Sequence, residues 1–81
     1  MEFQARLMAF KGRRTQEECA DLLTCSRQAL VTWLSGRSIP NEDMVRAWIA
    51  SANEDVRQFG LVEWRARNAD VLRDLFLNPV A

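Results

Sequence analysis

The sequence predicts an all-α fold, a small bundle of four to six short helices. Apolar residues recur three and four positions apart along most of the chain, which is the spacing of one helical face. Residues that cap helices stand before several of these runs, and glycine or proline follows them. The chain has 81 residues, 48% of them hydrophobic, so it can bury one small core and is expected to form one domain.

The first helix is expected at the N-terminus. Phe3, Leu7 and Phe10 fall on one face at helical spacing, and Gly12 follows them in the position of a C-cap. The connection that follows is basic and contains Lys11, Arg13 and Arg14.

Two short helices separated by a tight turn are expected next. Thr15 and Glu18 have the spacing of a capping box, in which each side chain satisfies a free backbone amide, so the second helix begins at Gln16. The apolar pattern stops at residues 24–26, and Ser26 can cap a third helix that ends at Gly36. The expected inward faces hold Cys19, Ala20, Leu22, Leu23, Leu30, Trp33 and Leu34.

Pro40 ends this region, because proline lacks an amide proton and disfavours the helical conformation at Ile39. Asn41 can cap a fourth helix, and Glu42 and Asp43 suit the positive end of its dipole. The apolar stripe expected on this helix consists of Met44, Val45, Trp48, Ile49 and Ala52.

The last third of the chain allows two interpretations. One or two helices are favoured, because Val56 and Phe59 share one helical face and Gly60 lies where the apolar faces change. The alternative is a short strand over residues 60–66, which could pair across a dimer. In that strand apolar and charged residues would alternate, Val62 and Trp64 against Glu63 and Arg65.

Composition argues against several classes of function. No apolar run approaches the roughly 20 residues that cross a bilayer, and the N-terminus lacks the features of a signal peptide, so a cytoplasmic protein is expected. With two cysteines and no histidine, neither a disulfide framework, a metal site nor a cofactor is predicted, and Cys19 and Cys25 are expected to be buried thiols. No nucleophile stands beside a base and no glycine-rich phosphate loop occurs, so no catalytic residue is predicted and the chain is not expected to be an enzyme.

The net charge is zero but unevenly spread. Residues 1–41 contain six basic and four acidic residues, whereas residues 42–81 contain five basic and seven acidic ones. The N-terminal half is therefore the part that could face a polyanion, although its excess of positive charge is small.

Residues 15–40, TQEECADLLTCSRQALVTWLSGRSIP, resemble the helix-turn-helix of the phage repressor and Cro-like family. A small residue, Ala20, stands where the two helices of that motif cross, and the closing Trp-Leu-Ser-Gly-Arg and the later proline also match. Thr24 departs from the family, which usually has glycine there. Either the turn is shaped differently here, or Thr24 tolerates a positive φ, which costs a β-branched residue about 1 kcal/mol. Ala29 and Val31 also leave the exposed face of the third helix less polar than usual. The resemblance implies a lambda-repressor-like bundle that binds double-stranded DNA.

The resemblance also implies roles for individual residues. The third helix would enter the major groove with its N-terminal end nearest the bases. Arg27 and Gln28 would contact bases, since arginine pairs with guanine and glutamine with adenine, and Thr32 would follow one turn later. The expected phosphate contacts are Gln16, Ser26, Arg37, Ser38 and Asn41, with Arg13 and Arg14 added for their charge.

One helix contacts only a few base pairs, so a homodimer on an inverted repeat is expected. Residues 1–53 would form the DNA-binding core, and residues 54–81 a dimerisation segment packed on it within a single domain. The candidate dimer interface consists of Leu61, Trp64, Leu72, Leu75 and Phe76.

The expected function is that of a transcriptional regulator of phage or bacterial type, acting as a repressor, with no membrane or small-molecule partner. Activation instead of repression, an antitoxin instead of a phage regulator, and a tetramer instead of a dimer stay open. The alternative function is a protein-binding inhibitor or adaptor that reuses the helix-turn-helix scaffold. Neutral overall charge and the apolar C-terminal third favour this alternative.

Overall fold

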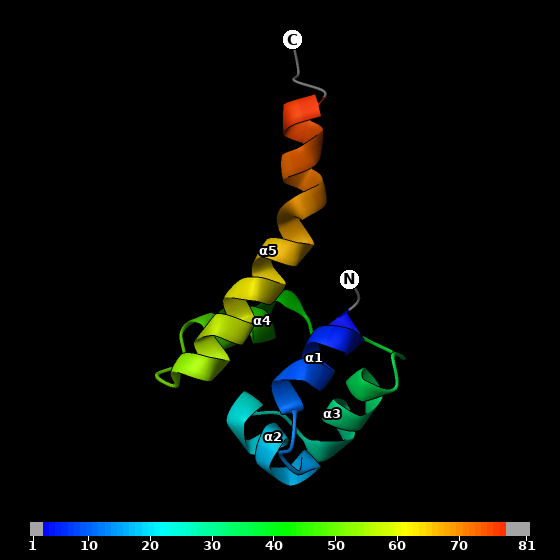
Figure 1. Cartoon of the computed structure of the whole chain (residues 1–81), viewed down its shortest axis with the longest axis vertical. Coiled ribbons are helices and arrows are strands. Elements are labelled where there is room, and N and C mark those ends of the chain that lie inside the picture. Colours follow the sequence, from blue (N-terminus) through cyan, green and yellow to red (C-terminus); the bar gives the residue numbers. More distant parts are fainter. Residues whose placement is uncertain (1–2, 78–81) are drawn as a thin grey trace.

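A computed structural model describes the backbone of residues 3–77 and the side chains of residues 3–69. The helices are α1 (Phe3–Lys11), α2 (Gln16–Leu23), α3 (Arg27–Leu34), α4 (Glu42–Ile49) and α5 (Glu54–Leu77) (Figure 1). The predicted all-α fold is confirmed, and residues 3–77 contain no strand. The alternative of a strand over residues 60–66 is wrong, because this segment lies within the single helix α5.

The predicted helix starts are confirmed by their caps. The side-chain oxygens of Thr15, Ser26 and Asn41 each accept a hydrogen bond from the backbone amide three residues later, at 3.1, 3.0 and 2.9 Å. Glu42 and Asp43 lie in the first turn of α4 as predicted, and acidic residues also occupy the first turns of α2 and α5. Gly12 and Gly36 end α1 and α3 with φ values of 51° and 78°, a conformation that glycine adopts without strain.

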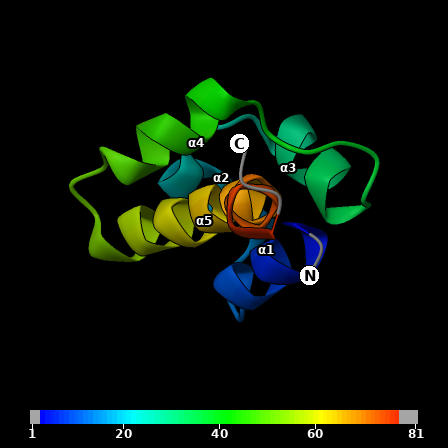
Figure 2. The ribbon, with the colours of Figure 1, turned by 90° about the horizontal axis from the view of Figure 1, so that it is seen from above.

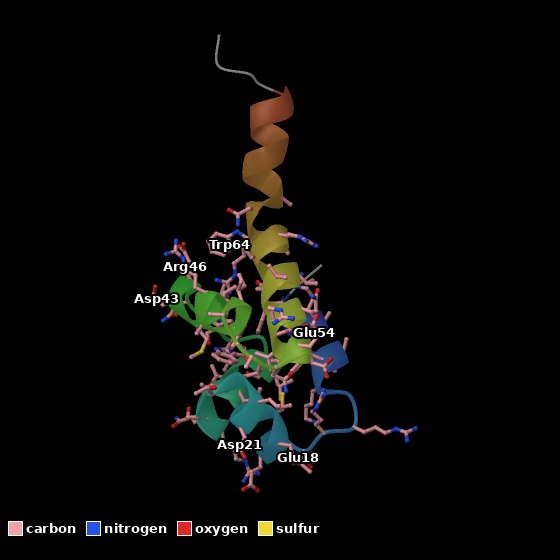
Figure 3. All side chains as sticks on the ribbon, turned by 90° about the vertical axis from the view of Figure 1, so that its left-hand side faces the viewer. Glu18, Asp21, Asp43, Arg46, Glu54 and Trp64 are labelled. Atoms are coloured by element: carbon pink, nitrogen blue, oxygen red, sulfur yellow. The ribbon has the colours of Figure 1, made fainter. Side chains whose placement is uncertain are left out.

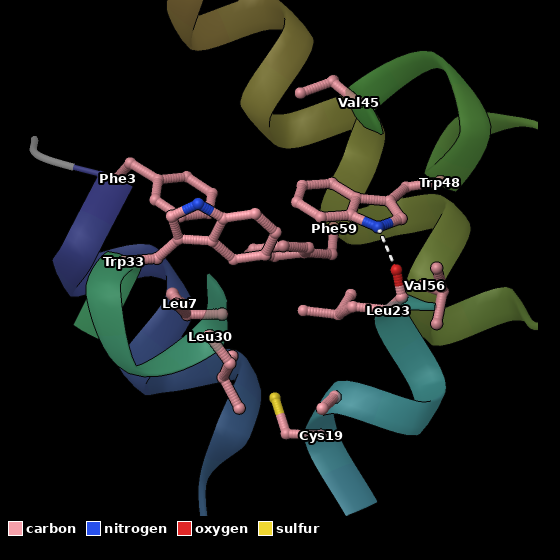
Figure 4. Close-up of a cluster of buried hydrophobic side chains, with 11 residues drawn as sticks. Phe3, Leu7, Cys19, Leu23, Leu30, Trp33, Val45, Trp48, Val56 and Phe59 are labelled. Atoms are coloured by element: carbon pink, nitrogen blue, oxygen red, sulfur yellow. Dashed lines mark hydrogen bonds between the residues drawn. The ribbon is translucent and has the colours of Figure 1, made fainter. Parts of the chain in front are cut away.

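The core lies where α1, α2, α3, α4 and the first half of α5 meet (Figure 4). Four aromatic side chains form its centre: Phe3, Trp33, Trp48 and Phe59. The ring centroids of contacting pairs among them are 5.2 to 6.3 Å apart. The other buried apolar residues are Leu7, Cys19, Ala20, Leu23, Leu30, Val45 and Val56. Tertiary packing of short amphipathic helices therefore holds the fold together, since helices of eight residues are not stable alone in water.

Two expectations about burial are wrong. Ala52 is exposed, because α4 ends at Ile49 and Ala52 lies in the connection to α5. Cys25 is only half-buried, because it stands in the turn between α2 and α3, whereas Cys19 inside α2 is fully buried.

Gly60 marks the place where α5 crosses α4 most closely. A Cβ atom on Gly60 would lie 2.9 Å from both the backbone nitrogen of Ile49 and the Cβ of Trp48. Viewed from above, α5 runs between α4 and α1, so this crossing closes the core from one side (Figure 2). The last turns of α5 then extend away from the other helices (Figure 1). None of the helices in the described part of the chain is both long and apolar enough to cross a membrane.

Candidate nucleic-acid interface

The turn between α2 and α3 adopts the backbone conformation that its family resemblance requires. Thr24 has φ 54° and ψ 43°, in the left-handed region that non-glycine residues seldom occupy. The amide of Thr24 donates to Asp21 O (3.2 Å), and the amide of Cys25 donates to Ala20 O (3.0 Å). These two carbonyl oxygens in the last turn of α2 therefore have hydrogen-bond donors. Of the two alternatives that the sequence leaves open, the second is found: φ is positive at Thr24, and the strain is tolerated within a hydrogen-bonded turn.

Arg27 and Gln16 are brought together by the helix-turn-helix geometry. Arg27 is the first residue of α3 and Gln16 the first residue of α2, and Arg27 Nε donates to Gln16 Oε1 at 3.4 Å. Arg27 and its neighbour Gln28 are both exposed, whereas Gln16 is half-buried. The N-terminal ends of the two helices therefore share one polar surface, which the spacing of eleven residues alone does not reveal.

The exposed side of α3 carries both polar and apolar side chains. The Thr32 hydroxyl donates to the carbonyl oxygen of Gln28 at 2.8 Å, so its orientation is fixed by its own helix. Val31 is 43% exposed one turn after Arg27, which leaves an apolar side chain beside the polar start of the helix. Val31 was not among the residues assigned a DNA contact from the sequence. The one sequence signal for it is helical spacing, since it stands three positions after Gln28.

The predicted phosphate contacts divide into two groups. Arg37 and Ser38 are exposed in the connection between α3 and α4, and Arg13 is exposed before α2. Ser26 and Asn41 are also exposed, but their side-chain oxygens accept the capping hydrogen bonds of α3 and α4. The caps thus place these two residues at helix N-termini, where backbone amides attract anions, but Glu42 and Asp43 oppose this attraction beside Asn41.

Arg14 faces a different part of the molecule. Its guanidinium lies 5.0 Å from the centroid of the Phe10 ring, donates to Phe10 O at 2.6 Å, and contacts Asp55 at 3.4 Å. These partners belong to α1 and α5. The structure therefore does not bring Arg14 together with Gln16 and Arg27, although only one residue separates it from Gln16 in the sequence.

Acidic residues limit the surface that could face DNA. Glu18 and Asp21 are exposed on the outer side of α2, with Leu22 beside them, and they lie together at the lower end of the molecule in Figure 3. Glu42 and Asp43 are exposed at the start of α4. Phosphates would be repelled from both places, and Glu17 and Glu18 add negative charge to the first turn of α2. The exposed side of α3, with Gln16 beside its N-terminal end, is therefore the surface best suited to a polyanion.

The candidate dimer residues lie on α5. Leu61 and Trp64 are half-buried, and the Arg46 guanidinium of α4 lies 5.5 Å from the centroid of the Trp64 ring (Figure 3). Trp64 thus packs against the core of its own chain. The side chains of Leu72, Leu75 and Phe76 lie outside the described residues, although the backbone of α5 is helical through all three positions.

The two thiols are poor nucleophiles and ligands in this environment. Burial, with Cys19 nearby, raises the pKa of the Cys25 thiol to about 11. Burial also raises the pKa of Cys19, although the charges of Arg14 and Lys11 act in the opposite direction. Both thiols are therefore protonated at neutral pH. Within residues 3–69, no group of three histidine, cysteine, aspartate or glutamate side chains lies close enough to hold a metal ion.

Comparison of the chain with known protein families, with curated proteins and with solved structures finds no match. The likeness to the phage repressor and Cro-like family therefore rests on residues 15–40 themselves.

Proposed function

We propose that the protein is a sequence-specific, double-stranded DNA-binding transcriptional regulator that acts as a repressor and binds an inverted repeat as a homodimer. One observation carries this proposal. Arg27 and Gln28 are exposed at the N-terminal end of α3, and Gln16 at the start of α2 contacts Arg27. A helix that enters the major groove by its N-terminal end presents residues in these positions to base edges.

The chemistry of these side chains suits the major groove. Arg27 can donate two hydrogen bonds to O6 and N7 of guanine, and Gln28 can pair with N6 and N7 of adenine. Each such pair contributes about 1–3 kcal/mol of discrimination between bases. Val31 offers an apolar side chain to a thymine methyl group on the same side of α3.

Gln16 has two functions in this proposal. Its Oε1 holds Arg27 in place, while its NH2 group is a donor suited to a phosphate oxygen. The backbone amides at the start of α2 favour an anion at the same place. Arg13, Arg37 and Ser38 would contact phosphates on either side, because all three are exposed next to α2 or α3.

The homodimer is proposed to form through α5. The backbone of the last turns of this helix extends away from the other helices, and helices gain most of their stability in water by packing on a neighbour (Figure 1). Leu72, Leu75 and Phe76 share one face of this extension by their spacing. A second copy packed on that face would stabilise both helices and supply the second α3 that an inverted repeat requires.

An apolar groove favours the alternative function, a protein-binding inhibitor or adaptor. The groove has a volume of about 490 Å³ and lies between α1 and α5. Its apolar lining consists of Ala9, Phe10, Phe59 and Val62, with Arg6, Arg14, Asp55 and Gln58 around it. A groove of this composition suits an apolar segment of another protein better than a nucleic acid.

A salt titration separates the two functions. Binding to a random-sequence duplex would be followed by fluorescence anisotropy between 50 and 200 mM salt. If about four phosphates are contacted, affinity should fall about a hundredfold over this range, because counterions are released on binding. Absence of binding at the lowest salt would remove the DNA-binding proposal and leave the groove as the surface to pursue.

A further inference from the structure

The connection between α3 and α4 is held at both ends by helices outside the helix-turn-helix. At its start, Gln4 Nε2 of α1 donates to Leu34 O at 2.6 Å. At its end, Arg67 Nη2 of α5 donates to Pro40 O at 2.7 Å, across 27 residues of sequence. Between these two contacts lie Arg37 and Ser38, both exposed.

Arg67 is itself held by a buried carboxylate. Glu63 has a side chain that is 2% exposed, and its Oε1 accepts from Arg67 Nε at 2.8 Å. The other oxygen, Oε2, contacts Arg6 Nε at 2.8 Å and Arg6 Nη2 at 2.7 Å. Because Nε of Arg67 binds Glu63 and Nη2 binds Pro40, the guanidinium plane is fixed at two points.

Burying this carboxylate in the core costs desolvation free energy. Glu63 follows Val56, Phe59 and Gly60 on the buried face of α5, where an apolar side chain would also fit the pattern. Burying a carboxylate with its arginines is often no more stabilising than well-packed apolar residues of the same volume. What an apolar residue would not provide is an oriented Arg67 that reaches the connection between α3 and α4.

We propose that Arg67 is a positioning residue for the DNA backbone contacts of Arg37 and Ser38. Through Pro40 O it fixes the end of the connection, while Gln4 fixes the start at Leu34 O. This inference rests on the proposed DNA-binding function. It assigns α5 a second role, because the same helix that would join two copies also sets where each copy touches phosphate.

A first test needs no DNA. The Arg37 amide lies three residues before Pro40 and donates to Thr32 O at 3.2 Å, so its hydrogen exchange reports whether the connection keeps its place when its end is released. Arg67→Ala also removes one partner of a buried carboxylate and lowers the stability of the whole fold, so exchange at Arg37 should speed up at least about tenfold more than at amides within α2 and α3. The matched control is Arg65→Ala, which removes the same charge from an exposed position on the same helix. Equal exchange rates at Arg37 in both variants would overturn the inference.

The second test measures DNA binding. Arg67→Ala should weaken binding to all sequences alike and lower the slope of log affinity against log salt by about one to two, while Arg65→Ala leaves both unchanged. Arg37→Ala should cost about tenfold in the wild-type protein and less than about threefold in the Arg67→Ala background, since a misplaced Arg37 has little left to lose. If the wild-type protein binds DNA and Arg37→Ala costs the same factor in affinity in both backgrounds, Arg67 has no positioning role.

A replacement variant and one further outcome complete the test. If Arg67→Ala loses its helical circular dichroism, Arg67→Met replaces it with the same expected results, because it keeps the apolar stem and lacks the donors. If the wild-type protein binds no duplex even at low salt, the proposed function fails and this inference fails with it. If instead the wild-type protein binds DNA and Arg67→Ala binds with an unchanged slope of log affinity against log salt, only this inference is overturned.

Discussion

The indole Nε1 of Trp48 donates a 2.9 Å hydrogen bond to the carbonyl oxygen of Leu23, the last residue of α2 (Figure 4). Both side chains are buried. The end of a helix leaves carbonyl oxygens without a helical partner, and this bond satisfies one of them inside the core. It also ties the start of the turn at Thr24 to α4, so the orientation of α3 depends on the same buried contact.

Trp48→Phe removes this donor and leaves the Leu23 carbonyl buried without it. We expect the free energy of unfolding to fall by about 2 kcal/mol, the combined effect of lost packing and an unsatisfied acceptor. Urea unfolding followed by circular dichroism measures the change. Trp33→Phe, also in the aromatic centre of the core, serves as the comparison and should cost less. Equal losses would show that the hydrogen bond contributes nothing beyond packing.

Gly60→Ala should destabilise the protein even though alanine is the better helix former. The new Cβ would lie 2.9 Å from the Ile49 backbone nitrogen, and backbone cannot move aside as a flexible side chain can. Overpacking of this kind costs about 1–3 kcal/mol, more than the roughly 1 kcal/mol that helix propensity returns.

The opposite exchange at an exposed position of α5 is the control for Gly60→Ala. Ala66→Gly should also destabilise, by about 1 kcal/mol, through propensity alone. Both exchanges can be compared by urea unfolding. A more stable Gly60→Ala protein would mean that α4 and α5 do not approach as closely as described.

Thr24→Gly should stabilise the protein. Glycine adopts the left-handed conformation of this residue without the steric cost that a β-branched side chain carries, and the net gain should be about 0.5–1 kcal/mol. Thr24→Ala keeps a Cβ and should gain less. Thermal unfolding of the three proteins measures the order, and a Thr24→Gly protein no more stable than wild type would argue against strain in this turn.

The raised pKa of the Cys25 thiol makes stability depend on pH in the alkaline range. The pKa of Cys25 is about 11 in the folded protein, above the value of about 8.5 expected for an unfolded thiol. The folded state therefore holds its proton more tightly, and the stabilisation, complete below about pH 8.5, is lost as pH rises through 11. The urea midpoint should fall over this range, and it should fall less steeply in Cys25→Ala. Identical pH profiles of the wild-type and Cys25→Ala proteins would mean that folding does not raise the pKa of the Cys25 thiol.

The features predicted from the sequence are those that depend on neighbours in the chain. Thr15, Ser26 and Asn41 are predictable as caps because a cap acts on an amide three residues away, whereas the sequence left the φ of Thr24 open. Contacts across the fold could not be obtained in this way. The roles of Gly60 and Arg14 depend on which helices approach them, and no local pattern contains that information.

Glu63 shows how a local pattern can mislead. In the strand alternative, Val62 and Trp64 would share the face opposite Glu63, yet in α5 Glu63 is 1% exposed and Val62 is 47% exposed. Helical spacing was the better signal, since Glu63 follows Val56 by seven residues and Gly60 by three. What the sequence lacked was the partner, because Arg6 lies 57 residues away.

Selection of binding sites from random duplex DNA tests most directly whether α3 contacts bases. We expect the wild-type protein to enrich an inverted repeat whose half-sites lie one helical turn apart. Arg27→Ala/Gln28→Ala should lose this preference while keeping its circular dichroism spectrum, and the exposed α5 pair Gln58→Ala/Arg65→Ala, which removes the same residue types, should keep it. Enrichment of the same repeat by Arg27→Ala/Gln28→Ala, or of no sequence by the wild-type protein, would contradict base contact by these two residues.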